Sequence, residues 1–379
     1  MLKVSKNWRK NVNKSVFKKI SKLLFLFTLI VFVQQMDGRY LATAGEDGKI
    51  KVFEESKKAR FLKHKGVFSI LFSTHDPNKL FSVGSESIKI WNLVKPRGKE
   101  FEKEIYGRFC ALSLSPFDKN LIAFGSKTEV KVWDLSKSEC IKTFKHPSRV
   151  LSVLFSPHKP NILVSFSLKL GTRRDVGGIR VWDLSKEDEK KSRVMTLPCP
   201  AKFPNSLMFS PRNPNMLFVL VSKSIEIWDL SNMRQRKPIK SLYVGYGNSG
   251  LFSFSCDGKT IAVISGKTIK IWDVSDKDPE KWKEVRTLEG HKQNVTSVMF
   301  HPENPKRLYS GSGDLFSKYG EIKVWDLSKD EGKCIKTKRS HRGGVVSIAI
   351  SLQKKLALEK PEKHREEKKY TDVKIITVE

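Results

Sequence analysis

A short sequence pattern recurs along this chain and constrains its fold more than any single motif. In each copy, alternating apolar residues lead to an aromatic residue, as in SIKIWNL, EVKVWDL and TIKIWDV. The aromatic residues follow one another at gaps of 38, 42, 49, 46, 44 and 53 residues; they are Phe53, Trp91, Trp133, Trp182, Trp228, Trp272 and Trp325. A near-constant period of this size is typical of a chain built from repeated structural units.

Each unit has the character of four β-strands. In the seventh unit, VTSVMF (295–300) and RLYSGS (307–312) precede the aromatic strand and are separated by the turn sequence HPENPK. A fourth strand fits after the aromatic residue, as in CIKTF (140–144) and CIKTK (334–338). Four strands in a unit of this length predict one blade of a β-propeller, so the fold class is all-β.

The chain resembles the WD-repeat β-propeller family over nearly its whole length. The resemblance rests on the Gly290-His291 pair, on the run from Ser310 to Ser312 and on five Trp-Asp pairs, which are Trp133-Asp134, Trp182-Asp183, Trp228-Asp229, Trp272-Asp273 and Trp325-Asp326. It implies a single propeller in which His, Ser or Thr, Asp and Trp side chains form a hydrogen-bonded set within a blade. The best matches are His291, Ser310, Asp314 and Trp325, followed by His146, Ser165, Asp175 and Trp182.

Other units match this set less well. The second-strand position is Ala123, Val219 and Val263 in the third, fifth and sixth units. We expect those blades to depend more on apolar packing around their aromatic residues. Trp91, Trp133, Trp228 and Trp272 are then structural anchors of their blades, like Trp182 and Trp325.

An apolar run from Leu23 to Val33 has the look of a signal peptide or membrane anchor. It holds eleven residues, too few for a bilayer span of roughly twenty, and no small-x-small cleavage site follows it. Alignment with the seventh unit instead places the run in register with the first strand of a blade. We therefore expect it to be that strand, with a targeting signal as the alternative.

The C-terminal end carries the pattern in weakened form. SHRGGVVSIAIS resembles the start of a unit, and YTDVKIITVE places Ile376 where the aromatic residue belongs. We therefore expect eight blades, the last being a degenerate one over residues 341–379, closed by an outer strand from residues 15–22. Seven blades remain the alternative if the last 35 or so residues form a tail. Residues 1–12 are expected to be a basic tail, and residues 13–379 the propeller.

Composition bears on compartment and chemistry. Five cysteines without a C-x-x-C pair favour neither a disulfide framework nor a zinc site, and predict a reducing intracellular compartment, cytoplasmic or nuclear. No G-x-S-x-G or H-E-x-x-H motif occurs. We expect no catalytic activity, no cofactor and no metal.

Two functions fit the sequence. The first is a scaffold that gathers other proteins, as the resemblance implies for most members of the family. The second is binding of RNA or an anionic surface, suggested by 72 Lys and Arg against 40 Asp and Glu and a net charge of +32. A salt-sensitive interaction would distinguish the second from the first.

Two long loops mark the expected protein-binding face. In this family the turns between second and third strands share a face with the links between blades, and two of these turns are expanded, at residues 167–178 and 312–321. They carry apolar, aromatic and arginine side chains of the types that dominate binding hot spots. The predicted contact residues are Arg173, Arg174, Leu315, Phe316 and Tyr319. The alternative is that these loops fold onto each other or are disordered.

Overall fold

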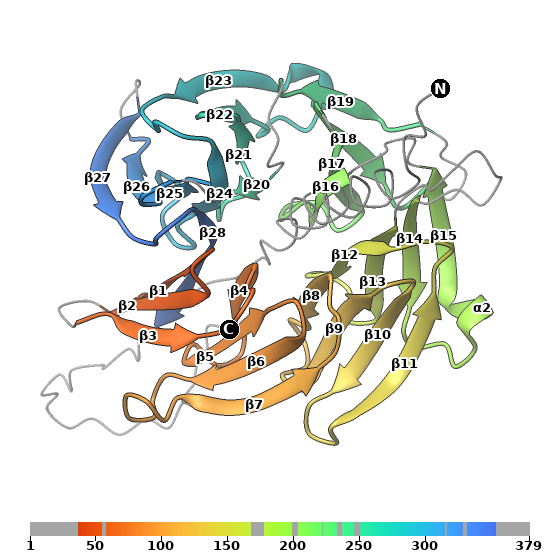
Figure 1. Ribbon diagram of the computed structural model, residues 1–379. Helices are drawn as coiled ribbons and strands as arrows, with labels where there is room; N and C mark the ends of the chain where they lie inside the picture. The colour runs from red at the N-terminus through yellow and green to blue at the C-terminus, as the bar shows by residue number, and fades with distance from the viewer. Residues whose placement is uncertain are drawn as a thin grey trace, which may run out of the picture.

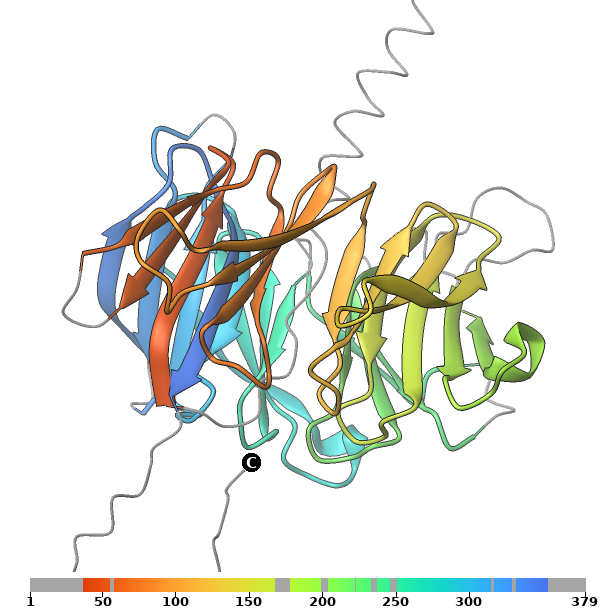
Figure 2. The ribbon, with the colours of Figure 1, turned by 90° about the horizontal axis from the view of Figure 1, so that it is seen from below.

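The computed structural model shows a ring of seven four-stranded antiparallel sheets (Figure 1). It describes residues 37–54, 58–167, 178–198, 204–221, 223–232, 237–245, 251–314, 317–328 and 332–353. In the view turned by 90°, the strands run across the thickness of the ring (Figure 2). The described residues therefore form a β-propeller, as the repeat predicted.

Each blade is ordered from an innermost to an outermost strand. Blades 1 to 4 are β28 (Val345–Gln353), β1 (Asp37–Gly45), β2 (Lys49–Glu54), β3 (Arg60–Lys63); β4 (Ser69–Phe72), β5 (Lys79–Val83), β6 (Ser87–Asn92), β7 (Phe101–Tyr106); β8 (Ala111–Leu114), β9 (Leu121–Ser126), β10 (Glu129–Asp134), β11 (Glu139–Lys145); and β12 (Val150–Phe155), β13 (Ile162–Ser167), β14 (Gly178–Asp183), β15 (Arg193–Pro198). Blades 5 to 7 are β16 (Pro204–Phe209), β17 (Met216–Val221), β18 (Ser224–Asp229), β19 (Lys240–Tyr243); β20 (Phe252–Phe254), β21 (Thr260–Ser265), β22 (Thr268–Asp273), β23 (Lys283–Leu288); and β24 (Val295–Phe300), β25 (Arg307–Ser312), β26 (Glu321–Asp326), β27 (Lys333–Arg339). Short helices α2 (Glu189–Ser192) and η1 (Pro279–Lys281) precede β15 and β23.

The blade count corrects our expectation of eight and confirms the alternative of seven among the described residues. β28, which we expected to begin an eighth blade, is instead the innermost strand of blade 1 and pairs with β1. The prediction that residues 23–33 fill that position is therefore wrong. Residues 1–36 and 354–379, including the expected closing strand at 15–22, lie outside the described residues.

Pairing of β28 with β1 closes the ring with residues about three hundred positions apart in the chain. The register places Leu41 opposite Ile350, Ala42 opposite Ala349 and Thr43 opposite Ile348. β28 also lies against the neighbouring innermost strands β4 and β24, and Figure 1 shows it, in blue, beside the red β1. Its burial on both faces explains the continuous apolar run VVSIAI.

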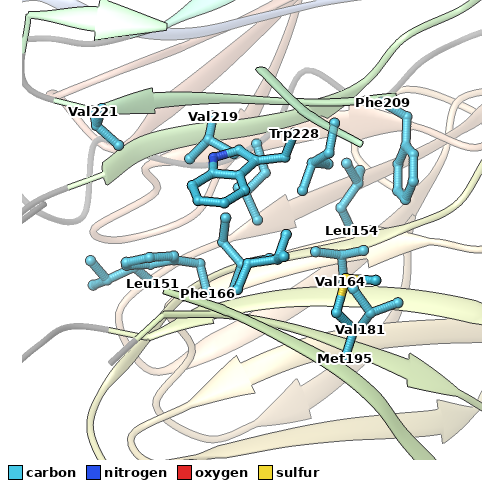
Figure 3. Packing of buried hydrophobic residues seen from close by; sticks show 14 residues of the cluster. Leu151, Leu154, Val164, Phe166, Val181, Met195, Phe209, Val219, Val221 and Trp228 are labelled. Carbon is cyan, nitrogen blue, oxygen red and sulfur yellow. The ribbon is translucent and has the colours of Figure 1, made fainter. Parts of the chain in front are cut away.

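The hydrophobic core lies between neighbouring blades rather than within one sheet. The cluster between blades 4 and 5 unites residues of β12 to β15 with residues of β16 to β18. In Figure 3, Trp228 of blade 5 faces Leu151 and Phe166 of blade 4. Burial of these side chains on both faces of each sheet stabilises the stacking of blades around the ring.

A buried serine joins histidine and tryptophan in three blades. In blade 7, Ser310 Oγ accepts a hydrogen bond from Trp325 Nε1 at 2.8 Å and lies 2.6 Å from His291 Nε2. In blade 4, Ser165 joins Trp182 at 2.6 Å and His146 at 2.8 Å, and in blade 2 the corresponding residues are Ser82, Trp91 and His64. Because each hydroxyl accepts from an indole N–H, its own hydrogen is available to an unprotonated imidazole nitrogen.

In the blades without the serine, the tryptophan N–H group lacks this hydrogen-bond acceptor. Val263 occupies the position in blade 6. In blade 3 the position holds Phe124, not Ala123 as we expected: Phe124 lies opposite Lys131 and packs on Trp133 at 6.2 Å between ring centres. The buried Nε1 atoms of Trp133 and Trp272 have no hydrogen-bond partner within the described residues. In blade 5, which has Val219 there, Trp228 Nε1 donates to Glu226 at 3.2 Å. These blades rely on apolar packing, as we expected from the sequence.

The three histidines are held neutral. Burial lowers the pKa of His146 and of His291 to about 3 and that of His64 to about 4. Nearby cations act in the same direction, foremost Arg180 at His146, Lys323 at His291 and Lys89 at His64. Neutral rings are the form that the serine hydrogen bonds require.

Replacement of Ser310 by alanine tests the hydrogen-bonded set. We expect Ser310→Ala to lower the free energy of unfolding by about 2 to 3 kcal/mol, because it leaves the Trp325 N–H and the His291 ring unpaired in the interior. The reverse change in blade 6, Val263→Thr, should alter it by less than about 1 kcal/mol, because threonine keeps the shape of valine and its hydroxyl gives the unpaired Trp272 N–H an acceptor. Urea unfolding measures both; equal losses in the two variants would contradict the assignment.

Acid titration tests the buried histidines. Their folded pKa values lie below the ordinary 6.5, so the unfolded state takes up protons first as pH falls. The free energy of unfolding should therefore decrease between pH 6.5 and about 4, by up to about 1.4 kcal/mol per histidine per pH unit. His291→Gln should be less stable at pH 7.5 yet show a shallower decrease. Parallel pH profiles for the variant and the natural chain would refute this explanation.

Candidate protein-interaction face

One face of the ring carries the turns between second and third strands of the blades. Most of these turns are short, with three residues between β1 and β2 and between β5 and β6, and two between β9 and β10 and between β21 and β22. Two are longer, as the sequence predicted: residues 168–177 between β13 and β14, and residues 313–320 between β25 and β26. The first lies outside the described residues, and of the second the structure describes residues 313–314 and 317–320.

The loop between β25 and β26 is held against the link that leads into β28. Backbone hydrogen bonds run from Gly320 N to His341 O at 2.8 Å, from Ser340 N to Gly320 O at 2.9 Å and from Gly343 N to Ser317 O at 3.0 Å. The Ser317 hydroxyl donates to Asp314 Oδ1 at 2.8 Å. We call residues 313–314, 317–320 and 341–344 the closure platform.

Glycine makes this close approach possible. A Cβ atom on Gly344 would lie 2.9 Å from the carbonyl carbon of Gly313, and one on Gly320 would lie 2.8 Å from Val345 N. Gly313 and Gly343 also have positive φ values, +125° and +79°. The loop is thus fixed by backbone contacts that other residues would obstruct.

The closure platform presents charged and aromatic side chains to solvent. Tyr319 is 47% exposed, and the Nζ of Lys318 lies 5.8 Å from the centre of its ring. Asp314 and Arg342 are exposed as well. A rigid backbone that displays a tyrosine and an arginine has the features of a protein-binding surface.

His341 of the closure platform belongs to a further hydrogen-bonded set, in blade 1, that we did not predict from the sequence. His341 Nε2 lies 2.9 Å from Thr43 Oγ1, and His341 Nδ1 lies 3.1 Å from Asp47 Oδ1. Burial lowers the pKa of His341, while Asp47 opposes that shift. The Thr43 and Asp47 partners lie near the other end of the chain, and the aromatic position of this blade is Phe53. The signal was the SHRGGVV sequence, which we had assigned to an eighth blade.

The structure places some of the other predicted site residues apart from one another, and does not describe the rest. In blade 7, Asp314 does not reach His291, whose Nδ1 has no partner within the described residues; Asp314 accepts from Ser317 instead. Asp175, Arg173, Arg174, Leu315 and Phe316 lie outside the described residues. Tyr319 is exposed where it was expected, but its contact with a partner stays a prediction.

Two further findings concern the described part of the chain. No helix there is long and apolar enough to cross a membrane. No group of three or more His, Cys, Asp or Glu side chains there is arranged to hold a metal ion.

Comparison with known proteins finds related sequences. The family described as "WD domain, G-beta repeat" matches residues 33–54 and 282–326. The chain is 23% identical to the "Transcriptional corepressor LEUNIG_HOMOLOG" of Arabidopsis thaliana over 73% of this chain and 32% of that protein. It is 26% identical to the "WD repeat-containing protein WDS homolog" of Arabidopsis thaliana over 79% of this chain and 55% of that protein. With the "Nuclear distribution protein PAC1" of Candida tropicalis it shares 35% identity over 31% of this chain and 22% of that protein.

These matches agree with the architecture, although the chain spans only part of the length of each of these relatives. The names of these relatives describe a corepressor, a repeat protein and a distribution protein rather than enzymes. The repeated Trp-Asp pattern, the seven-bladed ring and the family match lead to one conclusion: the described residues form a seven-bladed β-propeller, and the chain carries WD repeats.

Proposed function

We propose that this propeller is a non-catalytic scaffold that gathers other proteins through the face of the ring that carries the closure platform of blade 7 and the expanded turn of blade 4 at residues 168–177. The observation that carries the proposal is the exposure of Tyr319 and Arg342 on two segments whose backbones are hydrogen-bonded to each other. A partner that binds there would lose little backbone entropy, because residues 317–320 and 341–344 are already held by these hydrogen bonds.

The nature of the exposed residues supports a protein partner. Tyr and Arg are enriched among the few interface residues that supply most of the binding energy. In this proposal Leu315 and Phe316 would add to the contact at the closure platform, and Arg173 and Arg174 would form a second contact at the expanded turn of blade 4. Because the relatives' names include a transcriptional corepressor and a nuclear distribution protein, assembly with other proteins inside the cell is a consistent role.

The thiol groups and the chain organisation fit the same proposal. Within the described residues, Cys110, Cys140, Cys256 and Cys334 form no disulfide bond, which suits a reducing cytoplasmic or nuclear compartment. In the proposed organisation, residues 1–12 form a basic tail, and the remainder of the chain belongs to the propeller unit.

Affinity purification of the tagged full chain tests the scaffold proposal. Tyr319→Ala combined with Arg342→Ala should reduce recovery of at least one copurifying protein about tenfold or more, since hot-spot truncations of 2 kcal/mol or larger act together. The melting temperature should change little, because both side chains are exposed. Adding Arg173→Ala, Arg174→Ala and Phe316→Ala should complete the loss.

The matched control is Tyr243→Ala on the outer strand β19, where Tyr243 is 59% exposed. This variant should retain all partners. Recovery of every partner by the platform variant would place the binding site elsewhere on the propeller.

A further inference from the structure

One outer-strand position contacts the next blade in the same way around the ring. It lies opposite the Ile or Val three residues before the aromatic residue, and in six blades it is a buried apolar residue: Leu62, Ile105, Phe144, Leu197, Leu242 and Leu288. In blade 7 the position opposite Ile322 is Lys338, which is exposed. The boundary between blades 7 and 1 therefore differs from the other six.

The aromatic residue that faces Lys338, Phe53 of blade 1, also differs from its counterparts in the other blades. Where Phe144 of blade 3 stacks on Trp182 of blade 4 at 4.5 Å between ring centres, the Nζ of Lys338 lies 3.8 Å from the centre of the Phe53 ring. Phe53 replaces the tryptophan found in the other six blades and is half-buried. A cation over a partly exposed ring thus stands where other blades bury an apolar contact.

The face of blade 1 that lies toward blade 7 also carries basic and aromatic side chains. Lys49, Lys51 and Phe53 alternate along one face of β2, and Phe61 lies on that face opposite Lys51. Phe61 is 62% exposed, and the Nζ of Lys51 lies 5.9 Å from its ring centre. Lys51 also donates a hydrogen bond to the backbone oxygen of Ser340, which places this face of blade 1 against the end of blade 7.

Lys336 lies two residues before Lys338 and so shares its face of β27. We name the resulting surface the basic seam; it consists of Lys49, Lys51, Phe53, Phe61, Lys336 and Lys338.

The lysines of the basic seam have no acidic partner at ion-pair distance within the described residues. None of the ion pairs there involves its four lysines. The residues equivalent to Lys51 in blades 2, 3 and 6 do have acidic partners, with Lys89 3.8 Å from Glu104, Lys131 3.5 Å from Glu129 and Lys270 2.8 Å from Glu284.

The lysines of the seam also act on one another. Burial is the main cause that lowers the pKa of Lys51; Asp47 opposes it, while Lys49 and Lys338 add to it. Burial and then Lys336 lower the pKa of Lys338. The group is thus a concentration of like charge, and an anionic ligand would relieve its repulsion.

Lysines are common on exposed edge strands, where they prevent pairing with other sheets. That role does not account for Lys338, because its side chain lies over a ring of the next blade rather than along the free edge of β27. Nor does it account for exposed Phe61 between lysines, which adds apolar area at the surface.

We propose that the basic seam binds single-stranded nucleic acid, with the lysines contacting phosphates and Phe61 stacking on a base. Aromatic faces combined with unpaired cations are the recurring features of sites for single strands. An acidic peptide would satisfy the lysines but has no group that requires the open phenylalanine ring. This site is separate from the proposed protein contact at Tyr319 and does not depend on it.

Fluorescence anisotropy with labelled oligouridylate and oligothymidylate of about ten nucleotides tests the proposal on the full chain. Binding should weaken as salt rises, and Lys336→Gln with Lys338→Leu should make the slope of log K against log salt shallower by about 1.4, or about 0.7 for each lost phosphate contact. Lys338→Leu restores the apolar residue type of the other blades, so the melting temperature should not fall. Phe61→Ala should weaken binding about fivefold or more.

Matched controls separate the seam from the general positive charge. Lys142→Gln changes the position in blade 3 that corresponds to Lys336, and Phe101→Ala removes another phenylalanine, 48% exposed on β7. Both should bind like the natural chain. Binding of either oligonucleotide with the expected losses supports the proposal, and tighter binding of one of them shows whether RNA or DNA is preferred.

The proposal is overturned if neither oligonucleotide binds, or if the seam variants and the controls behave alike. It is also overturned if an oligoglutamate peptide binds more tightly than both oligonucleotides and loses its binding in the seam variant, since the ligand would then be an acidic peptide.

Discussion

Antiparallel pairing between β1 and β28 is the interaction on which the rest of this structure depends. Without it, blade 1 would lack its innermost strand and the ring would have two open sides with unpaired backbone groups. The pairing brings His341 to Thr43 and Asp47. It also sets the link at residues 341–344 against the loop of blade 7, and brings Lys338 over Phe53. The candidate protein surface and the basic seam both lie at this junction.

Much of the fold follows from the sequence because its signals are local. A tryptophan three residues after a buried Ile or Val marks the third strand of a blade, and the position of Ser310 or Ser165 marks the second. The same reasoning predicted apolar packing in blade 6, where Val263 leaves the Trp272 N–H unpaired. In blade 3 it selected Ala123, whereas the strand register places Phe124 at this position. Each of these features is contained in one unit of the repeat, so a comparison of units reveals it.

The manner of closure was not predictable in the same way. Residues 23–33 and 345–353 are both apolar segments of strand-like composition, and the choice of partner for β1 is made by hydrogen bonds between distant parts of the chain. Alignment within one unit favours the nearer segment, which is how the expectation of eight blades arose. For the candidate site, loop length identified the platform and Tyr319. The backbone contacts that fix the loop depend on Gly313, Gly320 and Gly344, whose roles appear only when the strands are assembled.

Three departures from the repeat lie where the ring closes: Phe53 for tryptophan, Lys338 for an apolar residue, and an expanded loop in blade 7. Local exceptions to an otherwise consistent pattern are where function is expected in a repeat protein.

The most direct test of this account is a cross-link between Ala42→Cys and Ala349→Cys, which lie opposite each other in the β1–β28 pair. Oxidation should join residues 42 and 349 in one chain, as detected by mass spectrometry of the linked peptides, whereas Thr43→Cys with Ala349→Cys should not cross-link, because residue 43 points to the other face of the sheet. Failure of the first pair, or equal yields for both, would contradict closure of the ring by β28.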